Sequence, residues 1–179
     1  FHLDIELVLD RIKSGKSKDL IMPIRKENDK KLRNDLKKGL PSILFSGKFK
    51  KREDKYIQEH SGFICLDFDD YDNSKDMANE KKRLMADIHV FSVFKSPSGN
   101  GFKVIVKIPP DAQNHKLYFN ALEEHFSSDH FDTTSKNISR VCYESYDPLI
   151  YINKDSSMWS VMSEPDYQER EAVEVSVPI

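Results

Sequence analysis

Residues 63–70 read Phe63-Ile64-Cys65-Leu66-Asp67-Phe68-Asp69-Asp70, an apolar run of high strand propensity that ends in carboxylates. Because side chains alternate along a β-strand, Asp67 and Asp69 are predicted to share one face while Phe68 packs on the other. Two unit charges about 4 Å apart repel by roughly 4 kcal/mol at an effective dielectric of 20. A divalent cation removes this repulsion, so the pair indicates a metal site. The alternative is that both aspartates simply open the polar turn at 70–74.

The composition describes a single charge-rich domain whose charge is unevenly spread. The chain has 179 residues, 38% hydrophobic and 32% charged, which is enough for one core, and no apolar run is long enough to span a bilayer. Residues 1–60 carry 16 Lys and Arg against 10 Asp and Glu, whereas the remainder carries 12 against 20. A basic front and an acidic body fit a bound polyanion and a bound cation, although ordinary solvated faces give the same totals.

Cysteine and histidine usage gives weaker signals. Cys65 and Cys142 both lie in apolar runs, which predicts buried thiols in a reducing, cytoplasmic compartment. The six histidines show no spacing typical of metal ligands and are predicted to lie on the surface or in loops, with His60 the least certain. The first residue is Phe, so we expect a fragment of a longer protein, with the acidic stretch 163–179 as a linker to a following domain.

Residues 1–60 are expected to form a helical, basic lead-in packed on a core at 61–162. One helix face is formed by Ile5, Val8, Leu9 and Ile12, and Gly15 can stop that helix. A second helix is predicted at 29–38, with Leu32 and Leu36 facing inward. A short strand at 42–46 and a basic turn at 47–52 follow.

The core has a regular order of predicted elements. Strands are expected at 62–69, 90–95, 102–108 and 141–146, and helices at about 75–88 and 111–126. This β-α-β-β-α-β order is the split unit of ferredoxin-like folds, shared by RNA-recognition modules and many polymerase palms. The predicted class is therefore α+β, with residues 149–152 and 157–161 as extra edge strands.

The topology predicts that three polar clusters meet at one end of the sheet. The first and third strands should pair antiparallel, and the fourth strand should lie on the other side of the first. The clusters are Asp67 with Asp69; the turn residues Ser96, Ser98, Gly99 and Gly101 with Lys103; and Asp132 with Ser139 and Arg140.

Each cluster has a functional and a plain interpretation. The turn at 96–101 offers backbone amides to phosphate oxygens beside Lys103, or it is an ordinary hairpin turn. Asp132 is a third metal ligand or the cap of the turn at 133–135, and Arg140 contacts phosphate or braces a carboxylate. A separate basic loop either binds nucleic acid or is merely solvated, and its cations are Lys48, Lys50, Lys51 and Arg52.

Three motifs carry a family resemblance. They are Leu66-Asp67-Phe68-Asp69, then Ser96-Pro97-Ser98-Gly99-Asn100-Gly101-Phe102-Lys103, and finally Asp132 followed by Ser139-Arg140. These motifs resemble the active-site motifs of archaeo-eukaryotic primases, the prim-pol superfamily. The chain is similar to the branch called the VirE N-terminal or BT4734-like domain, found in mobile-element replication proteins of Bacteroides-type bacteria. The likeness covers about residues 5–160 and includes residues 40–47 and 60–62.

The resemblance implies template-directed nucleotidyl transfer. It implies that Asp67, Asp69 and Asp132 hold two Mg²⁺ or Mn²⁺ ions, and that Ser98, Lys103 and Arg140 hold a nucleoside triphosphate. It further implies nucleic acid, DNA foremost, as a partner and a helicase or other replication domain downstream. Many prim-pol enzymes have a histidine where this chain has Lys103, a change that triphosphate binding tolerates better than catalysis. The alternative is a catalytically silent DNA-docking domain.

Other proteins with similar patterns fit less well. An RNA-recognition module needs exposed aromatics on its central strands, where this chain offers Lys103, Ile105 and Lys107. A haloacid-dehalogenase-type phosphatase needs alternating β-α units, which the predicted hairpin at 90–108 disfavours. A calcium loop starting at Asp67 would need a glycine at its sixth position and a glutamate at its twelfth, and neither is present.

Overall fold

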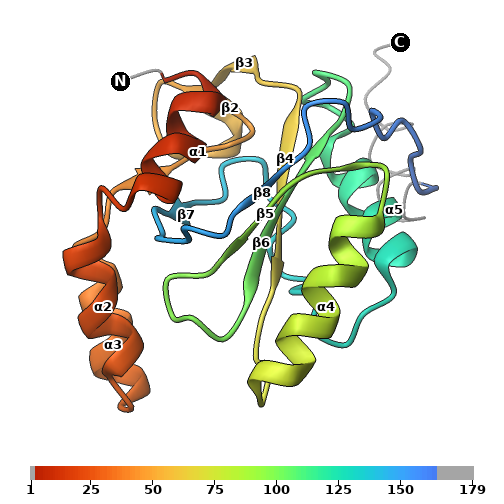
Figure 1. The fold of residues 1–179 in the computed structure, drawn as a ribbon. Helices are drawn as coiled ribbons and strands as arrows, with labels where there is room; N and C mark the ends of the chain where they lie inside the picture. The colour runs from red at the N-terminus through yellow and green to blue at the C-terminus, as the bar shows by residue number, and fades with distance from the viewer. Residues whose placement is uncertain (1–2, 165–179) are drawn as a thin grey trace, which may run out of the picture.

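A computed structural model describes residues 3–164, in which a four-stranded antiparallel sheet carries helices on both faces (Figure 1). The helices are α1 (Ile5–Ser14), α2 (Lys18–Lys26), α3 (Lys30–Lys37), α4 (Ser74–Ala86) and α5 (His115–Phe126). The strands are β1 (Ser42–Ile43), β2 (Gly47–Phe49), β3 (Ile57–His60), β4 (Phe63–Phe68), β5 (Val90–Lys95), β6 (Phe102–Lys107), β7 (Cys142–Tyr143) and β8 (Tyr151–Ile152). The predicted α+β class is confirmed. The predicted linker at 163–179 lies outside the described residues from residue 165 onward.

The central sheet has the strand order β4-β6-β5-β8. The predicted antiparallel pairing of the first and third core strands is confirmed, because β4 pairs with β6 and places Asp67 opposite Lys103. The predicted hairpin is also present as β5 and β6, and β8 confirms an edge strand within 149–152. The second predicted edge strand, at 157–161, is wrong. Trp159 is instead buried in the core, and its backbone N–H donates to the carbonyl of Lys107 at 2.8 Å.

The predicted position of the fourth core strand is also wrong. The strand β7 pairs with β1 in a separate two-stranded sheet, with Ser42 opposite Tyr143. The chain after β7 is held by the N-terminal segment. The buried carboxylate of Glu144 accepts hydrogen bonds from Arg11 at 2.9 Å and from Ser17 at 2.7 Å. Among residues 3–164, the only pairing on the outer side of β4 is an isolated bridge at its end, between Phe68 and Phe131.

The sheet separates two hydrophobic cores. On one face, α4 and α5 pack on the sheet through residues such as Leu84, Phe119 and Leu122, which meet Leu66 and Phe68. On the other face, α1 contributes Val8, Leu9 and Ile12 to a cluster that includes Phe94 and Ile105. The predicted face of α1 is therefore confirmed, and Gly15 ends that helix at a φ of 80°. No helix within residues 3–164 has the length and apolar character that a membrane span requires.

The N-terminal region differs from its prediction at two points. The helix α2 was not predicted; it contains Pro23, which disfavours a helix interior, and its buried Ile21 and Ile24 pack with Leu40 and stabilise it. The expected inward direction of Leu32 and Leu36 is wrong, since these side chains are 49% and 41% exposed. The predicted strand at 42–46 is reduced to β1, and the predicted basic turn at 47–52 begins as β2, which forms a hairpin with β3.

Candidate functional site

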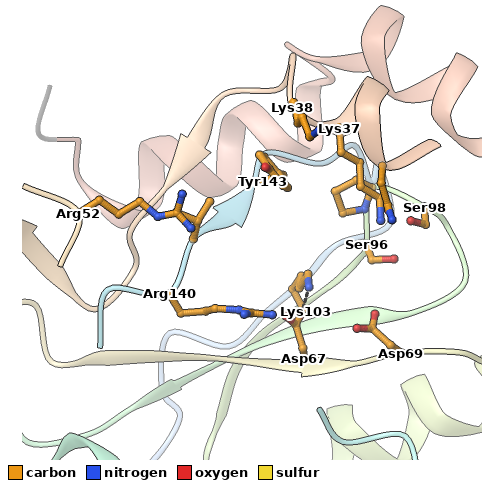
Figure 2. Close-up of a pocket in the computed structure, with 13 residues that line it drawn as sticks. Lys37, Lys38, Arg52, Asp67, Asp69, Ser96, Ser98, Lys103, Arg140 and Tyr143 are labelled. Carbon is orange, nitrogen blue, oxygen red and sulfur yellow. Dashed lines mark ion pairs between the residues drawn. The ribbon is translucent and has the colours of Figure 1, made fainter. Parts of the chain in front are cut away.

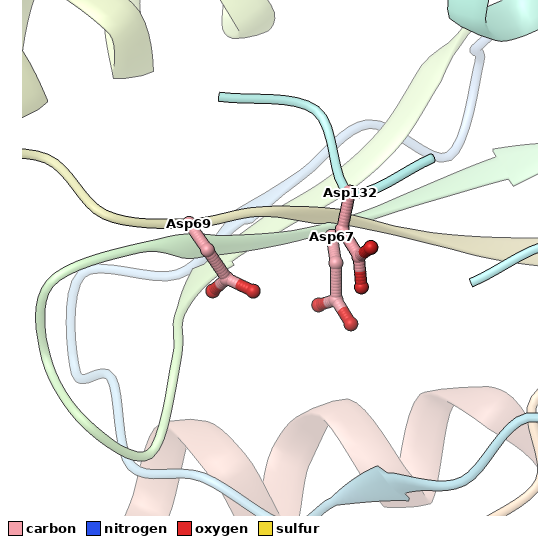
Figure 3. Close-up of side chains that lie close together, drawn as sticks. All are labelled: Asp67, Asp69 and Asp132. Carbon is pink, nitrogen blue, oxygen red and sulfur yellow. The ribbon is translucent and has the colours of Figure 1, made fainter. Parts of the chain in front are cut away.

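Three carboxylates gather at the end of β4. Asp67 lies on β4 and Asp69 just beyond it, and the fully buried Phe68 between them packs on the opposite face, as predicted. Asp132 is placed beside them by two backbone hydrogen bonds, from Asp69 N–H to the His130 carbonyl at 2.8 Å and from Asp132 N–H to the Asp67 carbonyl at 2.9 Å. The three side chains point the same way (Figure 3), and each offers an oxygen within 4.8 Å of the other two.

A cavity of about 400 Å³ is lined by members of each of the three predicted clusters, although Asp132 itself does not line it. Asp67 and Asp69 line it together with Ser96 and Ser98 from the turn after β5. Its lining cations are Lys37, Lys38, Arg52, Lys103 and Arg140 (Figure 2). The predicted convergence of residues from the first, third and last core segments at one end of the sheet is therefore confirmed, although β7 reaches this end by pairing with β1.

The glycines of the 96–101 turn allow its backbone conformation and its close packing, and they do not line the cavity. Gly99 has a φ of 84°, and a Cβ there would lie 3.2 Å from the Arg25 side chain. At Gly101 a Cβ would lie 2.4 Å from the Phe68 carbonyl oxygen and 2.8 Å from a carboxylate oxygen of Asp69. Glycine at position 101 thus allows the turn to approach the carboxylates closely.

Several residues of the predicted site lie apart from the cavity lining. The buried Ser139 hydroxyl donates to the Asp54 carboxylate at 2.5 Å. Of the four cations in the predicted nucleic-acid loop, Arg52 lines the cavity, whereas Lys48, Lys50 and Lys51 do not. Lys48 pairs instead with Glu59, and the Lys51 ammonium lies over a tyrosine ring.

The electrostatics differ among the three carboxylates. Asp67 is buried and forms an ion pair with Lys103, its register partner on β6. Burial, together with repulsion from Asp132 and Asp70, raises the pKa of Asp69. Burial also acts to raise the pKa of Asp132, but hydrogen bonds from the following turn outweigh it and lower that pKa.

Asp132 and Arg140 each fit both of the interpretations that the sequence left open: Asp132 as turn cap and member of the carboxylate cluster, Arg140 as brace of a carboxylate and part of the cavity wall. The carboxylate of Asp132 accepts hydrogen bonds from the Thr134 backbone N–H at 2.9 Å and the Ser135 hydroxyl at 2.6 Å, which makes it the cap of its turn. The same carboxylate belongs to the cluster with Asp67 and Asp69. Arg140 braces it through a 3.3 Å contact and also lines the cavity.

The sequence did not single out the part of the site that α3 provides. Asn34, Lys37 and Lys38 line the cavity from the end of this helix. The helix carries lysines on several faces, so no periodic signal distinguishes Lys37 from Lys30 or Lys31.

The histidine prediction needs one correction. His115 is 3% exposed, and its Nδ1 lies 3.1 Å from Nε2 of His60. The buried His115 and the half-buried His60 form a pair that connects the first turn of α5 to the end of β3. The prediction of buried thiols holds for Cys142, whereas Cys65 is half-buried.

Comparison with known proteins identifies one family. The family described as "BT4734-like, N-terminal domain" matches residues 35–152, a range that contains the three carboxylates and all five cations of the cavity. No curated protein and no solved structure matches the chain. The match begins within α3 and leaves α1 and α2 outside it.

Proposed function

The chain belongs to the family of BT4734-like N-terminal domains, and from this premise we propose that it is a primase- or polymerase-like nucleotidyltransferase domain. It binds a divalent metal ion through Asp67, Asp69 and Asp132, and a nucleoside triphosphate in the cavity that Asp67 and Asp69 line. The observation that carries the proposal is a cluster of three carboxylates, two of which line a cavity of about 400 Å³ together with five cationic side chains.

The carboxylate cluster fits hard divalent cations. Asp67, Asp69 and Asp132 supply oxygen donors alone, which suits Mg²⁺ or Mn²⁺ better than a metal that prefers nitrogen or sulfur. Burial is the larger cause of the raised pKa of Asp69, and repulsion from Asp132 within the cluster adds to it. Two bound ions would activate a 3′-hydroxyl and neutralise the charge that develops on the phosphoryl oxygens and the leaving pyrophosphate.

The cations of the cavity supply the phosphate side of the proposed function. Five cationic side chains and two carboxylates line the cavity, so its wall carries an excess of positive charge that suits a polyphosphate. Arg140 presents a planar donor fork that matches two phosphate oxygens, and Lys103 presents a mobile point charge. Ser98 also lines the cavity, and its hydroxyl can donate to phosphate.

One observation favours a second candidate, a catalytically silent nucleic-acid-docking domain. The Lys103 ammonium already neutralises Asp67, and both side chains are largely buried. In the enzyme, the Lys103 ammonium can form an ion pair with either Asp67 or a phosphate oxygen, one at a time. In the docking domain, the ion pair with Asp67 is permanent.

The family resemblance also supports a cellular setting for the proposed function. Nucleic acid, DNA foremost, would be the partner in the replication of a mobile element, in the cytoplasm. A helicase or another replication domain would accompany this domain in the full-length protein.

Calorimetric titration of Mn²⁺, with and without ATP or dATP, tests the metal site. We expect Mn²⁺ to bind the wild-type chain and to bind more tightly with a triphosphate, whereas Asp69→Asn weakens Mn²⁺ binding at least tenfold. Asp70→Asn is the matched control, because Asp70 is exposed, lies outside the cluster and has a φ of 62° that asparagine tolerates. Equal Mn²⁺ affinities for wild type and Asp69→Asn would refute the metal site.

Primer extension then separates the enzyme from the docking domain. Extension that requires Mn²⁺ or Mg²⁺ and is lost in Asp132→Asn supports nucleotidyl transfer. Nucleic-acid binding without any extension, in a chain that binds Mn²⁺, favours the docking domain.

A further inference from the structure

The end of α3 brings a half-buried positive charge to the cavity. Lys37 is half-buried in the cavity wall and forms no ion pair within residues 3–164. Its neighbour Lys38 pairs with Asp35 at 2.6 Å at an exposed position. Lys30 and Lys31, on the same helix, are exposed and do not line the cavity.

The surroundings of Lys37 are unfavourable for an ammonium without a bound anion. Burial lowers the pKa of Lys37, and the nearby charge of Lys103 lowers it further. Asp69 and Asp70 act in the opposite direction but do not outweigh these effects. A half-buried ammonium that faces a second cation is stabilised when an anion lies between them.

The position of this charge identifies the kind of anion. Lys37 and Lys38 lie across the cavity from Asp67 and Asp69, with Lys103 between the two walls (Figure 2). A ligand that reaches both walls needs a chain of negative charges rather than a single carboxylate. A polyphosphate has this form, because its successive phosphates are linked in a row and each bears charge.

We propose that Lys37, with Lys38 and Asn34, forms a phosphate subsite on α3 that binds the distal phosphates of a nucleoside triphosphate. The subsite deepens the proposed function, because it assigns the N-terminal helices a direct part in binding the triphosphate. Lys37 is its central cation, Lys38 adds charge at the exposed edge, and the Asn34 side-chain amide adds a neutral donor.

Inorganic tripolyphosphate is the probe that isolates this subsite. In EDTA and at low ionic strength, tripolyphosphate binding reports on the cations alone, since no metal ion can bridge it to the carboxylates. We expect the wild-type chain to bind it, and Lys37→Gln to weaken the affinity roughly tenfold, the loss typical of a charge-assisted hydrogen bond. Lys31→Gln, the matched control on the same helix, should change the affinity less than twofold.

Three outcomes distinguish this subsite from the function on which it rests. If Mn²⁺ does not bind but tripolyphosphate binding still depends on Lys37, the proposed function fails and the subsite stands. If Mn²⁺ binds through Asp69 and Lys37→Gln binds tripolyphosphate like wild type, the subsite is refuted. If Lys37→Gln weakens only the binding of a single-stranded oligonucleotide without a 5′-triphosphate, the residue contacts a nucleic-acid backbone and the proposal is also refuted.

Discussion

The backbone N–H of Asp132 donates a hydrogen bond of 2.9 Å to the carbonyl oxygen of Asp67. This bond continues an isolated bridge in which Phe131 lies opposite Phe68, with their ring centroids 5.3 Å apart in an edge-on contact. The third carboxylate therefore reaches the cluster because the preceding phenylalanine is anchored in the core. Core packing and the geometry of the site are directly coupled at this point.

Phe131→Ala should reduce both the stability of the fold and its affinity for metal. The side chain is buried, so its loss should lower the free energy of unfolding by about 3–5 kcal/mol. Because Asp132 follows directly, Mn²⁺ affinity should fall as well, measured by calorimetry at a temperature where the variant remains folded.

Phe126→Ala is the matched control for that prediction. Phe126 packs edge-on against the same Phe68 ring, with centroids 5.5 Å apart, but it belongs to α5 and adjoins no carboxylate of the cluster. We expect a similar loss of stability with unchanged Mn²⁺ affinity. Equal Mn²⁺ affinities in Phe126→Ala and Phe131→Ala would show that Phe131 does not position Asp132.

Lys103→Met should make the protein more dependent on metal. Removing the ammonium leaves the buried Asp67 carboxylate unpaired, which should lower the free energy of unfolding by about 3 kcal/mol without metal. Mn²⁺ should then raise the melting temperature of Lys103→Met more than that of wild type, while triphosphate binds more weakly. Lys107→Met is the control, because that ammonium contacts backbone carbonyls at residues 154 and 156. Equal Mn²⁺ shifts in the two variants would contradict the prediction.

Stability should fall as the pH is lowered, because His115 is buried beside His60. The Gly62 N–H donates to Nδ1 of His60 at 3.0 Å, which leaves the proton on Nε2 to face Nδ1 of His115. Burial, with a smaller contribution from His60, lowers the pKa of His115 from 6.5 to about 4. Between these values the unfolded chain binds a proton that the folded chain excludes, so stability is complete above pH 6.5 and is lost toward pH 4.

Denaturant unfolding of wild type and His115→Gln, at pH 7.5 and at pH 4.5, measures this loss. The glutamine cannot take up the proton, so we expect the wild type to lose up to about 3 kcal/mol more than the variant between the two pH values. Each protein's loss is measured relative to its own free energy of unfolding at pH 7.5, so the destabilisation caused by the substitution itself cancels. Parallel losses in both proteins would show that His115 is not the group responsible.

Local periodicity was sufficient to predict the faces of the core strands. The alternation around Phe68 placed Asp67 and Asp69 on one side, and the glycine-rich turn fixed the β5–β6 hairpin. Both features depend on residues close together in the sequence, where side-chain period and turn chemistry decide the structure.

Contacts between distant, short segments could not be predicted in the same way. The strand β7 has only two residues, so its side-chain pattern cannot predict whether it pairs with β1 or with β4. Its pairing with β1 follows from Glu144, the residue after β7, which is held by hydrogen bonds from Arg11 and Ser17. Likewise, Lys37 reaches the cavity only because the α2–α3 hairpin is held against the rest of the chain. The residue that makes the clearest of those contacts is Arg25.

Arg25 joins α2 to the turn at 96–101. Its guanidinium donates to the Tyr146 carbonyl at 2.7 Å and to the Ser96 carbonyl at 3.1 Å, and its aliphatic atoms lie against Gly99. Arg25 therefore links the backbone of the turn to the hairpin that carries Lys37. Arg25 does not line the cavity, so it acts as a positioning residue.

Arg25→Lys should weaken triphosphate binding roughly tenfold, because lysine keeps the charge but cannot reach both carbonyls with one planar group. Mn²⁺ affinity should change less than twofold, since the carboxylates are positioned by β4 and residues 130–132. Arg33→Lys, on α3 of the same hairpin, is the matched control, because Arg33 contacts the carbonyl of Glu27 at 3.4 Å and not the turn. If both variants weaken triphosphate binding equally in calorimetry, Arg25 stabilises only the α2–α3 hairpin. A loss confined to Arg25→Lys means that the turn and α3 must be held together for the phosphates to bind.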